Sequence, residues 1–173
     1  DVFVLTRNYD TEYRSWLGDQ RGALSQPYPP TISELNQSFN QNITKKAMSD
    51  TIIYRPVAYK VLFGSKAQSE FQAKFRIIKI PGVTLTDNEI KNRVVDAITD
   101  FFDIANWDFG ETFYFTELAA YVHKETSGVL SSFVIVPEGA SSVFGDLFEV
   151  TPMSNELFIP DVNVNDIDII ENI

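Results

Sequence analysis

The sequence contains no cysteine and only one histidine among its 173 residues. The lack of cysteine excludes disulfide bonds, thiolate nucleophiles and cysteine metal sites, and it fits folding in a reducing compartment. No apolar run approaches the roughly 18 residues that a membrane-spanning helix needs. No glycine-rich phosphate loop, Gly-x-Ser-x-Gly elbow or dinucleotide fingerprint occurs either. We therefore expect no cofactor, no bound metal and no membrane partner.

The charge is negative in total and unevenly distributed. The net charge is −10, which argues against nucleic acid as a partner. Residues 1–80 carry 11 Lys/Arg and 7 Asp/Glu, whereas residues 81–173 carry 3 and 17. This division predicts either complementary surfaces, within one molecule or between neighbours in an assembly, or an acidic solvated half. The chain opens on Asp1 instead of Met, so we expect it to be a piece of a longer protein.

The best-specified segment is Thr86 to Asp103. Ile90, Val94 and Ile98 follow one another at four-residue steps, which is typical of one buried helix face. Thr86 and Glu89 have the spacing of a capping box, so the sequence also predicts where the helix begins. Its wide apolar face predicts that a sheet covers it.

Other segments predict an α+β domain over residues 1–137. Strands are expected at 2–6, 51–64, 70–80 and 129–136, and further helices at 31–48 and 116–127. Residues 7–30 contain Gly18, Gly22 and three prolines, and predict a long irregular loop. The strands at 51–64 and 70–80 are expected to form a hairpin. This order is typical of a ferredoxin-like split βαβ fold, with an antiparallel sheet and helices on one face.

The remainder, 138–173, is expected to be a C-terminal β extension with an acidic tail. It has short strand signals at 147–150 and 157–159, and it is too short to bury much surface alone. We therefore expect it to dock on the core or on another chain as an interaction segment.

An RNA-binding sheet would need aromatic residues on its open face. The expected outward positions are Ala58, Leu62, Gln72 and Ile78, none of which is aromatic. This pattern gives a second argument against a nucleic-acid partner.

Candidate catalytic residues are few. His123 is expected in the last turn of a helix, where a cation-friendly side chain is common without any catalytic role. Asp96, Asp100 and Asp103 share one helical side, which is typical of a solvated face. The alternative is that these carboxylates act as a paired general acid and base. The protein would then be a small ligand-binding or enzymatic domain.

The segment 161–172 invites comparison with a calcium loop, since Asp161, Asn163 and Asn165 occupy alternating positions. Asp166 stands where a glycine is expected, and Asn172 stands where a bidentate glutamate is expected. An acidic interaction tail is therefore the better interpretation.

Residues 80–137 carry a family resemblance. A V…AI..FF helix leads through a glycine-containing turn into F.FTEL..YV, followed by a Gly-Val strand. This stretch, with RPVAYKVLF before it, resembles the C-terminal half of phage baseplate J-like wedge proteins, nearest to the inner-ring wedge subunit of myovirus-type contractile-tail phages. The likeness covers residues 1–160, except the loop at 7–30.

The resemblance implies a non-enzymatic structural role in the virion, at the tail baseplate, after assembly in the host cytoplasm. It implies self-association, as a homodimer or a higher ring, and contact with other wedge subunits. Apolar residues outside the expected core are then candidates for contacts between chains, although each can equally be covered within its own domain. These residues are Trp16, Leu17, Phe144, Leu147, Phe148, Leu157 and Phe158.

Overall fold

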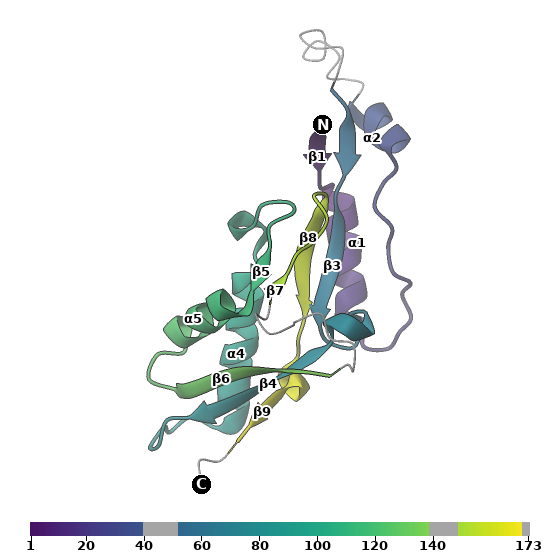
Figure 1. Cartoon of the computed structure of the whole chain (residues 1–173). Helices are drawn as coiled ribbons and strands as arrows, with labels where there is room; N and C mark the ends of the chain where they lie inside the picture. The colour runs from purple at the N-terminus through teal and green to yellow at the C-terminus, as the bar shows by residue number, and fades with distance from the viewer. Residues whose placement is uncertain (40–51, 139–148, 171–173) are drawn as a thin grey trace.

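Helices and small sheets are mixed along the chain in the computed structural model, which describes residues 1–39, 52–138 and 149–170 (Figure 1). The α+β class expected from the sequence is confirmed. In chain order, the elements are β1 (Val2–Val4), α1 (Arg7–Gly18), α2 (Ile32–Phe39), β2 (Tyr54–Pro56), β3 (Ala58–Phe63), β4 (Ala73–Lys79), α4 (Asp87–Phe101), β5 (Phe113–Tyr114), α5 (Phe115–Glu125), β6 (Leu130–Pro137), β7 (Glu149–Val150), β8 (Glu156–Asp161) and β9 (Ile167–Ile169).

Helix α4 forms where the local signals place it. The Thr86 hydroxyl accepts the Glu89 N–H, and the Glu89 carboxylate accepts the Thr86 N–H at 2.8 Å, so the capping box is confirmed. Ile90, Val94 and Ile98 are fully buried. They pack towards β9 and α5, so α4 and α5 together cover one face of the sheet that contains β4.

That sheet has the order β6–β4–β9. In β4, Phe75 and Ile77 are buried while Arg76 between them is exposed, so the predicted alternation is confirmed. β6 pairs antiparallel to β4, with Arg76 opposite Val134, and β9 pairs parallel to it, with Phe75 opposite Ile167.

The expected hairpin between β3 and β4 is wrong. β3 instead pairs in parallel with β8, with Tyr59 opposite Leu157, and only one isolated bridge joins its end to Gln72. The chain turns away at Phe63, whose φ of 83° lies in the left-handed region, and at Gly64. A Cβ on Gly64 would lie 2.0 Å from the carbonyl oxygen of Asp161, so only glycine permits this approach. Because the ferredoxin-like arrangement requires the hairpin, it is not confirmed.

Residues 7–18 form a helix, so the prediction of an irregular loop over 7–30 is wrong for its first half. Thr6 caps α1 by accepting the Tyr9 N–H. Tyr9 and Tyr13 are buried, and their rings pack on Tyr59 of β3 with centroids 5.7 and 5.1 Å away. Residues 19–31 then run back along α1 without regular structure (Figure 1).

Helix α2 begins as expected. The Glu34 carboxylate accepts the Thr31 N–H at 2.7 Å, which completes a capping box with the Thr31 hydroxyl. The predicted helix extends to residue 48, and the part beyond residue 39 lies outside the described residues.

The C-terminal segment belongs to the same core as the rest. Ile159 of β8 and Ile167 of β9 are members of the single buried cluster that includes Phe63, Phe75 and Phe113. The described part of 138–173 therefore packs on the core. The acidic tail is ordered by this pairing through Ile170, whose N–H donates to the Ile77 carbonyl.

Candidate functional site

Trp16 and Leu17 lie in the last turn of α1, where both are partly buried against the core. The Trp16 ring packs edge-on against Tyr13, with centroids 5.1 Å apart. Both residues therefore have contacts within their own domain and remain partly exposed.

Lys66 holds this turn in place. Its Nζ donates to the carbonyl oxygens of Trp16, Leu17 and Asp19, the last two at 2.8 and 2.9 Å. The same ammonium lies 5.1 Å from the Trp16 ring centroid. A cation at a helix C-terminus satisfies carbonyls that have no partner within the helix. The position of Trp16 and Leu17 is thus fixed by a residue distant in the sequence.

Leu157 and Phe158 are covered within the domain and are only 2% exposed each. The Phe158 ring contacts Trp107 and Phe113, with centroids 5.9 and 6.3 Å away. They were candidates for contacts between chains, and their burial between β3 and the aromatic core removes them from the surface. The other three candidates, Phe144, Leu147 and Phe148, lie outside the described residues.

The structure reveals an apolar surface that the sequence interpretation missed. Leu24, Tyr28 and Ile32 have exposed side chains, Tyr28 with 89% of its area accessible. We call these three residues the N-terminal face. Beside it, between α1 and α2, lies a hollow of about 450 Å³ lined in part by Tyr28, Pro30 and Leu35. The sequence did contain a signal for this surface, namely large apolar side chains at four-residue steps within a polar, proline-rich segment.

A second apolar surface lies near the N-terminus. Val2 and Ile53 are exposed neighbours, since the Val2 N–H donates to the Ile53 carbonyl at 2.8 Å. Phe109 is also exposed, and it packs edge-on against Phe3 with centroids 6.4 Å apart.

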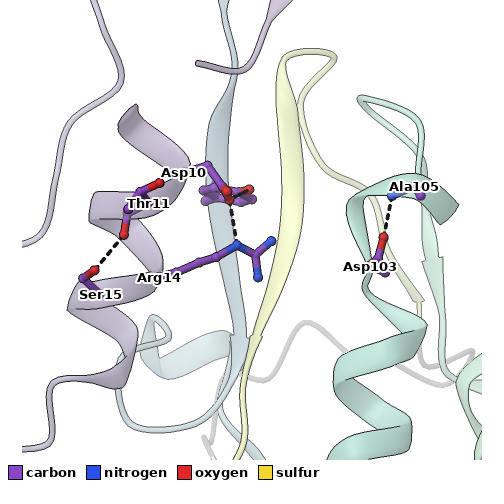
Figure 2. A network of polar contacts seen from close by, with 7 residues as sticks. Asp10, Thr11, Arg14, Ser15, Asp103 and Ala105 are labelled. Atoms are coloured by element: carbon purple, nitrogen blue, oxygen red, sulfur yellow. Dashed lines mark hydrogen bonds and ion pairs between the residues drawn. The ribbon is translucent and has the colours of Figure 1, made fainter. Parts of the chain in front are cut away.

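Among the polar clusters described, the one that most resembles a catalytic site consists of three hydrogen-bonded side chains between β3 and α1. Tyr59 donates its hydroxyl to Oδ1 of Asp10 at 2.5 Å, and the Arg14 Nε donates to the same oxygen at 2.7 Å (Figure 2). Burial, followed by the Asp10 carboxylate, raises the pKa of Tyr59, and burial raises the pKa of Tyr13 to about 12. Both phenols therefore stay protonated near neutral pH.

Asp96, Asp100 and Asp103 are exposed along α4 and just beyond it. The Asp103 Oδ1 accepts the Ala105 N–H at 2.8 Å and so caps the following turn (Figure 2). Asp100 and Asp103 border a shallow hollow of about 260 Å³ with Arg14 on its other side. Asp96 does not line this hollow, so the hollow does not bring the three carboxylates together, as the alternative function would need.

The carboxylates at 161–166 are used within the fold. Asp161 accepts the Lys66 N–H and Asp166 accepts the Asn163 N–H, both at 2.9 Å. Asn172 lies outside the described residues. Within the described ranges, no group of three or more His, Cys, Asp or Glu side chains is placed to hold a metal ion. His123 is exposed in the last turn of α5, as expected.

The aromatic residues of β3, of β4 and of the 3-10 turn Ser69–Phe71 before β4 do not offer a stacking platform. Tyr59, Phe63, Phe71 and Phe75 are all buried. Leu62, which was expected to point outward, is fully buried as well.

No family model matches the chain, and no curated protein matches it. In the parts of the chain that the structure describes, no helix is both long and apolar enough to cross a bilayer.

Proposed function

We propose that this protein is a structural component of a contractile phage tail baseplate, a wedge subunit that self-associates and links neighbouring wedges into a ring. Its partners are further copies of itself and other wedge subunits, and its place is the virion. Catalysis has no part in this role.

The observation that carries the proposal is the N-terminal face. Large apolar side chains at Leu24, Tyr28 and Ile32 are exposed at four-residue steps, and Tyr28 also lines an open hollow. Exposed apolar surface is a common feature of protein contacts. The sequence likeness over 80–137 supports the proposal independently. In the structure, that stretch contains α4, β5, α5 and β6 in chain order.

The uneven charge also favours assembly. Residues 1–80 carry an excess of Lys and Arg, whereas residues 81–173 carry an excess of Asp and Glu. Complementary charge of this kind favours attraction between neighbouring copies. Repacking of such contacts between two states is the proposed response to sheath contraction.

The test is light scattering on the protein across concentrations, alone and mixed with neighbouring wedge subunits. We expect the average mass to rise with concentration, and the variant Leu24→Ser/Tyr28→Ser to shift this rise to roughly tenfold higher concentration. Tyr114→Ser is the matched control, because Tyr114 is exposed on β5, outside the N-terminal face. A protein that is monomeric at every concentration and binds no wedge subunit would overturn the proposal.

A further inference from the structure

A further hollow, of about 320 Å³, lies between the end of α4 and α5. Its position follows from the chain path: α4 ends, the chain passes through a turn and β5, and α5 then packs back on α4. We call it the α4–α5 pocket. Its lining consists of Phe101, Asn106, Trp107, Glu111, Glu117 and Tyr121.

Three of these residues give the pocket aromatic walls. Phe101 lies between the other two rings, with centroids 5.5 Å from Trp107 and 5.6 Å from Tyr121. The Trp107 indole N–H donates to the Phe101 carbonyl at 2.7 Å, which fixes the ring and uses its only donor. All three rings are partly exposed. One face of the Trp107 ring stacks on Phe102, with centroids 5.3 Å apart, which leaves its other face for an incoming group.

The remaining charge in the pocket is negative. Glu111 and Glu117 contribute carboxylates, and the lining includes no Lys, Arg or His. The Glu111 Oε2 accepts the Asp108 N–H at 2.8 Å, so this carboxylate is held in place. Glu117 is exposed and forms no ion pair with a described residue.

The surroundings add to the negative potential. The pKa of Tyr121 is raised, first by partial burial and then by the carboxylates of Glu125 and Asp100. The lysine on α5 that is closest in sequence to Tyr121 is Lys124. It is paired with Glu125 at 3.8 Å and lies outside the pocket lining.

We propose that the α4–α5 pocket binds an arginine side chain of a partner protein, with its guanidinium against the aromatic walls and paired with Glu117. A planar guanidinium stacks on aromatic rings and pairs with a carboxylate in the same site, which an ammonium does less well. Charge complementarity argues for this occupant. The pocket has two carboxylates and three rings but no cation, so a positively charged group is the one that matches it. This inference does not depend on the baseplate role. Its test is separate from the light-scattering test of self-association.

The experiment uses tryptophan fluorescence, since Trp16 and Trp107 are the only two tryptophans. In a Trp16→Phe background, Trp107 is the sole reporter and lies in the pocket wall. Titration at constant ionic strength with N-acetyl-arginine methylamide should give a saturable change with a dissociation constant on the order of 10 mM. The neutral isostere N-acetyl-citrulline methylamide should give none over the same range.

Two variants separate the pocket from general electrostatics. Glu117→Gln should weaken binding about fivefold or more, because it removes the paired charge. Asp96→Asn, which removes the same charge from the exposed side of α4, should leave binding within about twofold. An equal response to citrulline, or equal weakening by Asp96→Asn and Glu117→Gln, would overturn the inference. Retained circular dichroism in both variants shows that each comparison is between folded proteins.

Discussion

Removal of the Lys66 ammonium is expected to cost a measurable part of the free energy of unfolding. Lys66→Met keeps the aliphatic stem against Trp16 but deletes the group that donates to three carbonyls at the end of α1. A hydrogen bond from a charged donor contributes about 1.5–3 kcal/mol, but these carbonyls are only partly buried and water can replace part of the interaction. Allowing for that hydration, we expect a loss of about 2–3 kcal/mol.

The assay is urea unfolding followed by tryptophan fluorescence, with thermal unfolding as a second measurement. For a chain of this size, the expected loss corresponds to a fall in Tm of about 4–10 °C. Lys79→Met is the matched control, because it removes the same charge from the exposed Lys79–Asp87 pair and should cost less than about 1 kcal/mol. The reasoning is refuted if Lys66→Met and Lys79→Met lose the same free energy of unfolding.

Three further changes test the fold. Gly64→Ala should destabilise the protein by about 2 kcal/mol or more in urea unfolding, because the new Cβ meets the Asp161 carbonyl oxygen at 2.0 Å; wild-type stability would contradict the close approach. Phe113→Ala should cost about 3–5 kcal/mol in the same assay, since the ring is fully buried among other aromatic rings; a cost below about 1 kcal/mol would show that it packs elsewhere. Glu89→Gln tests the pH dependence of stability. Hydrogen bonds from Thr86 lower the pKa of the Glu89 carboxyl in the folded protein. The stabilisation that this carboxylate provides is therefore present above its ordinary pKa of 4.5 and is lost as the pH falls through the lower pKa of the folded state. The variant should be less stable than the parent at pH 7 and equal to it in strong acid, and an unchanged difference across that range would exclude this linkage.

Elements specified by neighbouring residues were predictable from the sequence. Helix α4 has its capping box and its apolar period within a few residues, and β4 alternates strictly. The start of α2 was predictable for the same reason, from Thr31 and Glu34. In each case the interactions that define the element lie within it.

Elements that depend on distant residues were missed. Helix α1 contains Asn8, Asp10 and Gly18, which weaken its propensity, and it is stabilised by tyrosines packed on β3 and by Lys66. The spacing of Tyr9, Tyr13 and Trp16 behind a Thr6 cap was a usable signal for this helix. The partner of β3 could not be read locally, because Gly64 and Ser65 look like a hairpin turn while the actual partner, β8, lies far along the chain.

The candidate site was predictable only in part. Trp16 and Leu17 were identified as surface anchors and retain some exposure, but nothing local distinguishes them from Leu157 and Phe158, which are buried. The α4–α5 pocket was not predicted, because its residues come from α4, the following turns and α5, and only their packing brings two glutamates and three rings together.

The parallel pairing of β3 with β8 and of β4 with β9 has a consequence for synthesis on the ribosome. When Pro137 has just been translated, neither β8 nor β9 exists, and an edge of both β3 and β4 has no neighbour. Such nascent edges readily pair with foreign strands, and pairing between distant segments is slow to form. Completion of the β3 and β4 edges therefore has to wait for β8 and β9, and until then the exposed edges favour association with other chains.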